Sequence, residues 1–197
     1  MAPVHSEDPV RLSLIIGSTR EGRFGPTVAR WFLRLAREHQ GVEVDVIDLA
    51  DTELPDRIVE ESPLPAQVAE LAPRLAEADA FVVITPEYNR SFPAPLKTAI
   101  DWFHEEWAAK PVGFVSYGGV SGGMHAVQHL RSVFAELRAT SIRENVCFPN
   151  YWDGFDADGG WPKDARGSAE AAGGLLDELT WWARALRTHR GAEPLPS

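Results

Sequence analysis

The sequence has little cysteine, no long hydrophobic run and no excess of positive charge, and each shortage excludes a class of protein. Its single cysteine, Cys147, leaves no partner for a disulfide within the chain or for a thiolate metal cluster, and it favours a reducing compartment. No segment approaches the roughly 18 apolar residues of a membrane-spanning helix. Because 19 Lys and Arg face 29 Asp and Glu, the net charge is −10, which disfavours nucleic acids and anionic membranes as partners. We expect a soluble, cytoplasmic protein with neither kind of partner.

Strand and helix signals alternate along the 197 residues. Five short apolar segments are typical of strands, and each precedes a stretch whose apolar residues recur at helical spacing. The strand segments are residues 10–16, 42–49, 80–84, 111–117 and 141–148. This alternation predicts an α/β fold, with a parallel sheet of five strands covered by helices on both faces. We expect one domain, residues 10–190, between a loose arm (1–9) and a loose tail (191–197), with long loops at 50–65 and 150–163.

The sequence contains seven tryptophans, which we expect in the core and at contacts between subunits rather than in an aromatic binding stripe. Trp102, Phe103 and Trp107 give the third helical stretch more aromatic residues than one buried stripe needs. Aromatic residues are enriched in the cores of protein–protein interfaces, so this stretch is a candidate dimer face.

The loop after the first strand, residues 17–26, has the features of a phosphate site. Parallel sheets bind ligands at the carboxyl ends of their strands, and the start of the following helix attracts anions. Ser18 adds a hydroxyl, Arg20 and Arg23 add cations, and the glycines let a ligand approach the backbone. The loop is not a Walker-A motif, because Arg23 and Phe24 stand where that motif has Lys and Ser or Thr. An ordinary strand–helix turn with solvated arginines is the alternative.

The loop after the third strand, residues 85–95, combines rigidity with polar side chains. Three prolines stiffen it, and Glu87, Asn89 and Ser91 lie beside Tyr88. A stiff loop with directed polar groups suits the edge of a flat heterocycle. The alternative is that the prolines only end the strand and begin the next helix.

The loop after the fourth strand, residues 116–123, is rich in glycine. Its backbone N–H groups can reach a ligand without obstruction by side chains. The same loop contains the G-x-S-x-G pattern of a serine hydrolase at Ser121, followed in hydrolase order by an aspartate within 153–158 and by His189. We prefer ligand binding, because His189 falls in an apparently loose tail and a hydrolase leaves the first loop unexplained.

Two apparent metal motifs are incomplete. His125 and His129 lie four residues apart, but Ala126 stands where the H-E-x-x-H motif has its glutamate. The acidic run near residue 156 resembles a calcium loop, but its first and twelfth positions are Gly154 and Ala165. We therefore expect no metal site.

Taken together, the three loops resemble those of the NADPH-dependent FMN reductases, a flavodoxin-like family. The similarity rests on the runs from Gly17 to Arg23, from Pro86 to Pro93 and from Tyr117 to Gly123, within a region that spans residues 10 to about 148. The resemblance implies a flavodoxin-like, doubly wound three-layer sandwich with strand order 2-1-3-4-5. It also implies bound FMN, NADPH or NADH as co-substrate, and a homodimer or homotetramer.

By this resemblance, the first loop holds the FMN phosphate, the second flanks the isoalloxazine ring and the third lines the other side of the ring. The predicted cofactor-binding residues are Ser18, Arg20, Arg23, Phe24, Gly25, Pro86, Glu87, Tyr88, Asn89, Arg90, Ser91, Ser116, Tyr117, Gly118 and Gly119. Hydride passes from NAD(P)H through flavin N5 to a small acceptor such as a quinone, a flavin or an azo compound, so no catalytic side chain is nominated. Backbone N–H groups within 117–119 are expected to stabilise negative charge on the reduced ring. A non-enzymatic flavin electron carrier is a further alternative.

Two features depart from the family pattern. Arg90 stands where a small residue, often glycine, is common, so the opening above the flavin is expected to be narrowed or cationic. The acidic loop at 150–163 is longer than in many members. Both departures bear on the choice of substrate more than on flavin binding.

Overall fold

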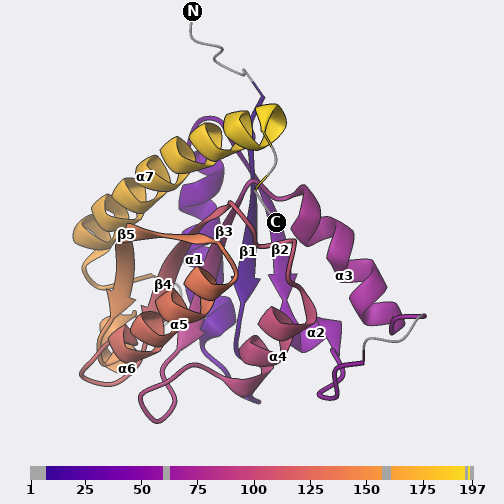
Figure 1. The fold of residues 1–197 in the computed structure, drawn as a ribbon. Coiled ribbons are helices and arrows are strands. Elements are labelled where there is room, and N and C mark those ends of the chain that lie inside the picture. The colour runs from indigo at the N-terminus through magenta and orange to yellow at the C-terminus, as the bar shows by residue number, and fades with distance from the viewer. Residues whose placement is uncertain (1–7, 60–62, 157–160, 194, 196–197) are drawn as a thin grey trace, which may run out of the picture.

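The computed structural model describes residues 8–59, 63–156, 161–193 and 195. Among these residues, five parallel strands form one sheet in the order β2-β1-β3-β4-β5 (Figure 1). The strands are β1 (Val10–Ile16), β2 (Val42–Asp48), β3 (Ala80–Pro86), β4 (Pro111–Tyr117) and β5 (Thr140–Phe148). The predicted α/β class and strand order are therefore confirmed.

Helices cover both faces of the sheet (Figure 1). One face carries α1 (Gly25–Glu38) and α7 (Ala165–Ala192), and the other carries α3 (Ala66–Glu77), α4 (Ala94–Trp102) and α5 (Met124–Glu136). The central strand β3 is buried at every position because it has helices on both sides. Within the two predicted loops lie the short helices α2 (Leu49–Thr52) and α6 (Tyr151–Gly154). No helix in the described part of the chain is long and apolar enough to span a membrane.

The aromatic residues after α4 correct one prediction. The helix ends at Trp102, and the next residues turn back so that Phe103 and Trp107 enter the core. The ring of Trp107 packs edge-on against Phe81 and Phe134, with centroid distances of 4.6 and 5.5 Å. With Phe103 and Trp107 only 2% and 1% exposed, neither is available for the predicted dimer face.

The end of α7 packs against the amino edge of the sheet, the end at which the parallel strands begin. Asp79 is 7% exposed and accepts a hydrogen bond from the Arg11 backbone N–H (3.1 Å). It also accepts from the guanidinium groups of Arg187 (2.9 Å) and Arg190 (3.4 Å). The helix extends to Ala192, so it includes the first two residues of the predicted tail. These ion pairs hold the last turns of α7 against the strands.

Lys110 makes a second set of contacts at the amino edge, on the face of the sheet that carries α3. Its Nζ donates to the carbonyl oxygens of Leu75 and Ala76 at the end of α3, both at 2.8 Å. Carbonyl groups in the last turn of a helix lack intrahelical partners, so the ammonium group satisfies them. Burial lowers the pKa of Lys110 to about 8.

Candidate functional site

The carboxyl ends of β1, β3 and β4 meet around a cleft of about 370 Å³. It is lined by Arg20, Glu21, Gly22, Arg23, Phe24, Pro86, Glu87, Tyr88, Tyr117, Gly118, Gly119, Tyr151 and Trp152. All three predicted loops contribute, because β3 lies between β1 and β4 in the sheet. The other predicted cofactor residues lie outside this lining: Ser18, Gly25, Asn89, Arg90, Ser91 and Ser116.

Positive charge reaches the cleft from Arg20 and from the start of α1. The helix has no side-chain hydrogen bond at its N-cap, Phe24, and no acidic residue in its first turn. Pro26 has no N–H and the Thr27 N–H donates to the Phe24 carbonyl oxygen (3.0 Å), so the Gly25 N–H, which has no partner among the described residues, and the helix dipole are what favour an anionic ligand. Arg20 is exposed and makes no ion pair or side-chain hydrogen bond with any described residue. Gly25 is buried, and a Cβ at this position would lie only 2.9 Å from Ile16 Cγ2. The absence of a side chain therefore lets α1 begin close to β1.

Arg23 lines the cleft, but its charge is already compensated. Its guanidinium group makes a bidentate pair with Asp48, including a contact of 2.8 Å between Nη2 and Oδ2, and Nη1 donates to the Ser18 carbonyl oxygen at 2.8 Å. The hydrogen bond to Asp48 raises the pKa of Arg23. Arg23, predicted to bind the cofactor, lines the cleft and also ties the first loop to the end of β2.

The hydroxyl group of Ser18 is buried between two tyrosines. It shares a hydrogen bond with the Tyr88 hydroxyl at 2.9 Å and another with the Tyr117 hydroxyl. Burial raises the pKa of Tyr117 well above its ordinary value, so this hydroxyl stays protonated. Ser18 was predicted to bind cofactor directly, but its side chain instead joins the first loop to the two tyrosines of the cleft wall.

Tyr88 to Ser91 form a tight hairpin turn. Their backbones exchange hydrogen bonds of 2.8 and 2.9 Å, and the two central residues, Asn89 and Arg90, have φ values of 49° and 68°. Two consecutive left-handed residues are the type I′ geometry, which favours glycine. Arginine at position 90 therefore carries a conformational cost. The turn directs Asn89 and Arg90 outward rather than into the cleft lining.

Glu87 anchors this turn to α5. Its carboxylate accepts the backbone N–H of His125 (3.0 Å) and the hydroxyl of Ser121. Nε2 of His125 lies 2.9 Å from the guanidinium of Arg90, which can only donate, so Nδ1 carries the hydrogen and donates to Glu87 (3.1 Å). Burial alone would raise the pKa of Glu87, but the hydrogen bonds from Ser121 and His125 outweigh it and the pKa is lowered. Glu87 is thus an ionised cap on the first turn of α5.

These contacts exclude the serine hydrolase. The hydroxyl of Ser121 donates to Glu87, a carboxylate, instead of to an imidazole. His189 lies in the last turns of α7, where the neighbouring Arg190 donates to the carbonyl of Ala109 before β4. Ser121 follows β4, so it lies at the opposite edge of the sheet from His189. The pattern has the right order but not the geometry.

The two histidines of α5 both hold the hairpin turn. His125 contacts Glu87 and Arg90, and Nδ1 of His129 lies 3.1 Å from the Ser91 hydroxyl. Within the described ranges, no group of three or more His, Cys, Asp or Glu side chains is arranged to hold a metal ion. The histidine pair therefore positions a loop.

The third loop offers fewer free groups than predicted. The Ser116 hydroxyl donates to the carbonyl of Gly122 (2.8 Å), and the N–H of Gly118 donates to Phe148 O (3.2 Å). Both were expected to face the cofactor, and both are used inside the fold. Among the N–H groups of 117–119, that of Gly119 has no partner in the part of the chain that the structure describes, so it can serve a ligand.

Sequence reasoning missed the aromatic wall of the cleft, Tyr151 and Trp152 in α6. The backbone N–H groups of Asn150 and Tyr151 donate to the carbonyls of Gly119 (2.9 Å) and Gly118 (3.3 Å). The segment after β5 is thereby fixed beside the third loop. An available signal was the pair of aromatic residues directly after the strand neighbouring β4, at the same edge of the sheet. The lining by Glu21 and Gly22 was also not predicted.

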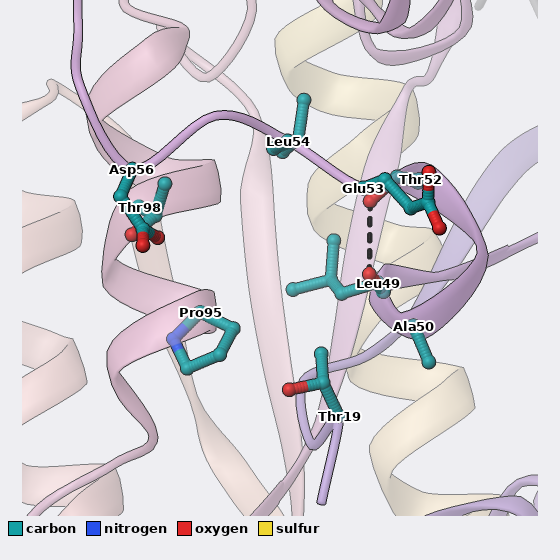
Figure 2. A pocket seen from close by; sticks show the side chains of 9 residues that line it. All are labelled: Thr19, Leu49, Ala50, Thr52, Glu53, Leu54, Asp56, Pro95 and Thr98. Atoms are coloured by element: carbon teal, nitrogen blue, oxygen red, sulfur yellow. Dashed lines mark hydrogen bonds between the residues drawn. The ribbon is translucent and has the colours of Figure 1, made fainter.

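A second cavity, of about 250 Å³, lies between α2 and α4 (Figure 2). Thr19 stands at one end, and Pro95 and Thr98 project from α4. The acidic Glu53 lies at the end of α2, and the acidic Asp56 lies on the opposite side, beside Thr98. The residues of the predicted cofactor site are not among its lining. With two carboxylates and no basic side chain in its lining, it does not suit a phosphate.

Comparison with known proteins identifies the family. The family model for NADPH-dependent FMN reductase matches residues 10–153. The chain belongs to this family. It is 35% identical over 150 residues to an NAD(P)H-dependent FMN reductase of Schizosaccharomyces pombe, covering 71% of this chain and 74% of the relative. It is also 37% identical over 139 residues to a quinone reductase of Escherichia coli K12, covering 67% of this chain and 73% of that one.

A solved structure confirms the fold. FerB, a flavoenzyme NAD(P)H:(acceptor) oxidoreductase of Paracoccus denitrificans, superimposes with a TM-score of 0.73 at 24% identity, covering 89% of this chain and 98% of FerB. The predicted flavodoxin-like architecture is therefore confirmed. Family membership also confirms FMN as cofactor and NAD(P)H as co-substrate, so the chain is an FMN-dependent NAD(P)H oxidoreductase.

Proposed function

We propose that the cleft binds FMN with its phosphate at the start of α1 and its ring beside the turns at 86–88 and 117–119. The observation that carries this proposal is that Arg20, whose side chain has no partner among the described residues, and the start of α1, which has no side-chain cap, lie at the same cleft as two rigid turns. The donor set matches the chemistry of FMN, which needs a cationic, N–H-rich end for a dianion and a flat, partly aromatic wall for a ring.

At the phosphate end, Arg20 and the Gly25 N–H at the start of α1 are the binding groups. Arg23 acts differently, since its bidentate pair with Asp48 and its bond to Ser18 O hold the loop in shape. Keeping this loop rigid lowers the ordering cost when the ligand binds. We assign binding to Arg20 and positioning to Arg23.

At the ring end, contacts within the protein hold the cleft wall in place without a ligand. Ser18 fixes the hydroxyl groups of Tyr88 and Tyr117, and Glu87 ties the second loop to α5. FMN held here would supply the redox chemistry, the transfer of a hydride equivalent from NAD(P)H to the acceptor, while these residues hold its ring. The N–H of Gly119 is placed to stabilise negative charge on the ring, because a fixed donor needs no reorganisation during the reaction.

The acceptor class, the assembly and the location extend this proposal. A quinone is the proposed acceptor because the E. coli relative is named a quinone reductase. A homodimer or homotetramer follows from the family resemblance, and a cytoplasmic location follows from the single cysteine and the use of NAD(P)H.

Steady-state oxidation of NAD(P)H by the FMN-loaded protein, with a quinone as acceptor, tests the proposed function. Multiple turnovers per second without a partner reductase are expected, whereas a simple electron carrier would be reduced slowly and would not turn over. Ser121→Ala is expected to keep this activity, since Ser121 only supports Glu87. Covalent labelling of Ser121 by a fluorophosphonate, together with absence of NAD(P)H turnover, would refute the proposal.

A further inference from the structure

Trp152 is a large aromatic side chain left exposed at the mouth of the cleft. It is 59% exposed, although it lines the same cavity as the flavin-flanking turns. An ideal Cβ built on Gly119 would lie 3.8 Å from Trp152 Cη2, so the indole edge reaches over the backbone of the third loop. Exposed aromatic surface at the edge of a binding cleft commonly marks a place where another flat group packs.

The backbone and neighbouring rings hold Trp152 in place. Hydrogen bonds from Asn150 N to Gly119 O (2.9 Å) and from Asp153 N to Asn150 O (2.8 Å) fix the start of α6. The Tyr151 ring lies between Phe24 and Trp152, with centroid distances of 4.8 and 5.2 Å. Phe24 immediately precedes α1, so this aromatic row runs along the cleft from the phosphate end to the open mouth.

We propose that Trp152 forms one wall of the electron-acceptor subsite and selects planar acceptors with two fused aromatic rings, such as naphthoquinones. This inference rests on the proposed function, because it takes the flavin ring as the opposite boundary of the subsite. A flat bicyclic acceptor gains dispersion and ring–ring attraction from the indole, whereas a small inorganic acceptor gains neither. A monocyclic quinone overlaps the indole less and gains an intermediate amount.

Trp152 acts on binding rather than on the chemical step. In the overall reaction NAD(P)H, a proton and a quinone give NAD(P)+ and a hydroquinone, so the acceptor gains two electrons and two protons. The bicyclic ring system is planar before and after this change. Stacking therefore stabilises substrate and transition state alike, and its loss raises KM while leaving kcat nearly unchanged.

The test compares acceptors of three sizes in the FMN-loaded enzyme: 2-methyl-1,4-naphthoquinone, 1,4-benzoquinone and ferricyanide. For Trp152→Ala we expect KM for the naphthoquinone to rise about tenfold. For benzoquinone we expect a smaller rise, and for ferricyanide less than a twofold change. Trp152→Phe is expected to recover most of the naphthoquinone affinity. Trp181→Ala is the matched control, since Trp181 lies on α7, is 64% exposed and packs edge-on against Trp182 instead of lining the cleft.

Two further readouts separate the possible failures. The FMN dissociation constant is measured from visible flavin absorbance, and the molar mass is measured by light scattering during gel filtration. Each of three results for Trp152→Ala overturns the inference. An equal rise in KM for all three acceptors would show that Trp152 serves the cofactor, and no rise for any acceptor would show that it has no role in binding. A change of molar mass would show that it forms a contact between copies of the chain. If the wild-type protein neither binds FMN nor oxidises NAD(P)H with any acceptor, the proposed function itself fails.

Discussion

At the amino edge of the sheet, Asp79 and Lys110 are almost fully buried and each has two or more hydrogen-bond partners. At the carboxyl edge, Arg20 is exposed and has no side-chain partner among the described residues, and Trp152 is more than half exposed. Both edges gather strand ends and helix ends. The difference is that the amino edge satisfies its own groups, whereas the carboxyl edge keeps groups for a ligand.

The same distinction separates two arginines of one loop. Arg23 is mostly buried and paired with Asp48, while the side chain of Arg20, three residues earlier, has no partner in the part of the chain that the structure describes. The residue type alone therefore does not reveal which cation binds the phosphate. What distinguishes the two arginines is whether the guanidinium group is already paired with a carboxylate.

The largest expected effect is the loss of stability when the shared carboxylate at the amino edge is removed. Asp79→Ala leaves two guanidinium groups and the Arg11 N–H without their shared acceptor, and removing one member of a buried ion pair costs about 3 kcal/mol or more. We expect the free energy of unfolding in urea to fall by about this amount. The FMN affinity of the folded protein should not change. A variant as stable as the wild type would show that this cluster does not hold α7.

Lys110 gives a pH-dependent effect at the same edge. Its pKa is lowered from 10.5 to about 8, so between these values the unfolded chain holds a proton that the native state has released. The stability of the protein therefore rises with pH through that window, and this site adds no pH dependence below pH 8, where both states are protonated. We expect the stability difference between the wild type and Lys110→Met to shift toward the wild type by about 2 kcal/mol from pH 7 to pH 9.5. A difference that is constant over this range contradicts the lowered pKa.

At the carboxyl edge we expect the opposite result for Arg20: a loss of ligand affinity without a loss of stability. Arg20→Ala removes a charged hydrogen-bond donor to the phosphate, so FMN affinity is expected to fall about tenfold, with the unfolding free energy of the apoprotein unchanged. Arg30→Ala removes the same charge from the exposed side of α1 and serves as control. Equal FMN affinity in Arg20→Ala and the wild type would remove Arg20 from the phosphate site.

The smallest effect concerns the hairpin turn. Arg90→Gly and Arg90→Ala both lose the contact with His125, but only glycine accepts a φ of 68° without strain. We expect Arg90→Gly to be more stable than Arg90→Ala by about 1 kcal/mol in thermal or urea unfolding. If alanine proves equally stable, the turn relaxes on substitution and the type I′ geometry is not a constraint.

The fold followed from the sequence because its signals are local and repeated. Continuous apolar runs such as β3 and helical stripes such as that of α1 each predict an element, and five repeats leave few topologies. The site was predicted in outline, since loops after neighbouring strands must meet at one edge. Its details depend on long-range pairs that spacing does not encode, such as Arg23 with Asp48. The same holds for the backbone bonds that bring Trp152 beside Gly119.

The most direct measurement is a titration of the purified protein with FMN, followed by visible absorbance and isothermal calorimetry, and then by addition of NADPH without oxygen. The account predicts one FMN per chain, an affinity that falls with Arg20→Ala but not with Arg30→Ala, and loss of the flavin absorbance near 450 nm when NADPH is added. Absence of saturable FMN binding, or bound FMN that NADPH leaves oxidised, would contradict it.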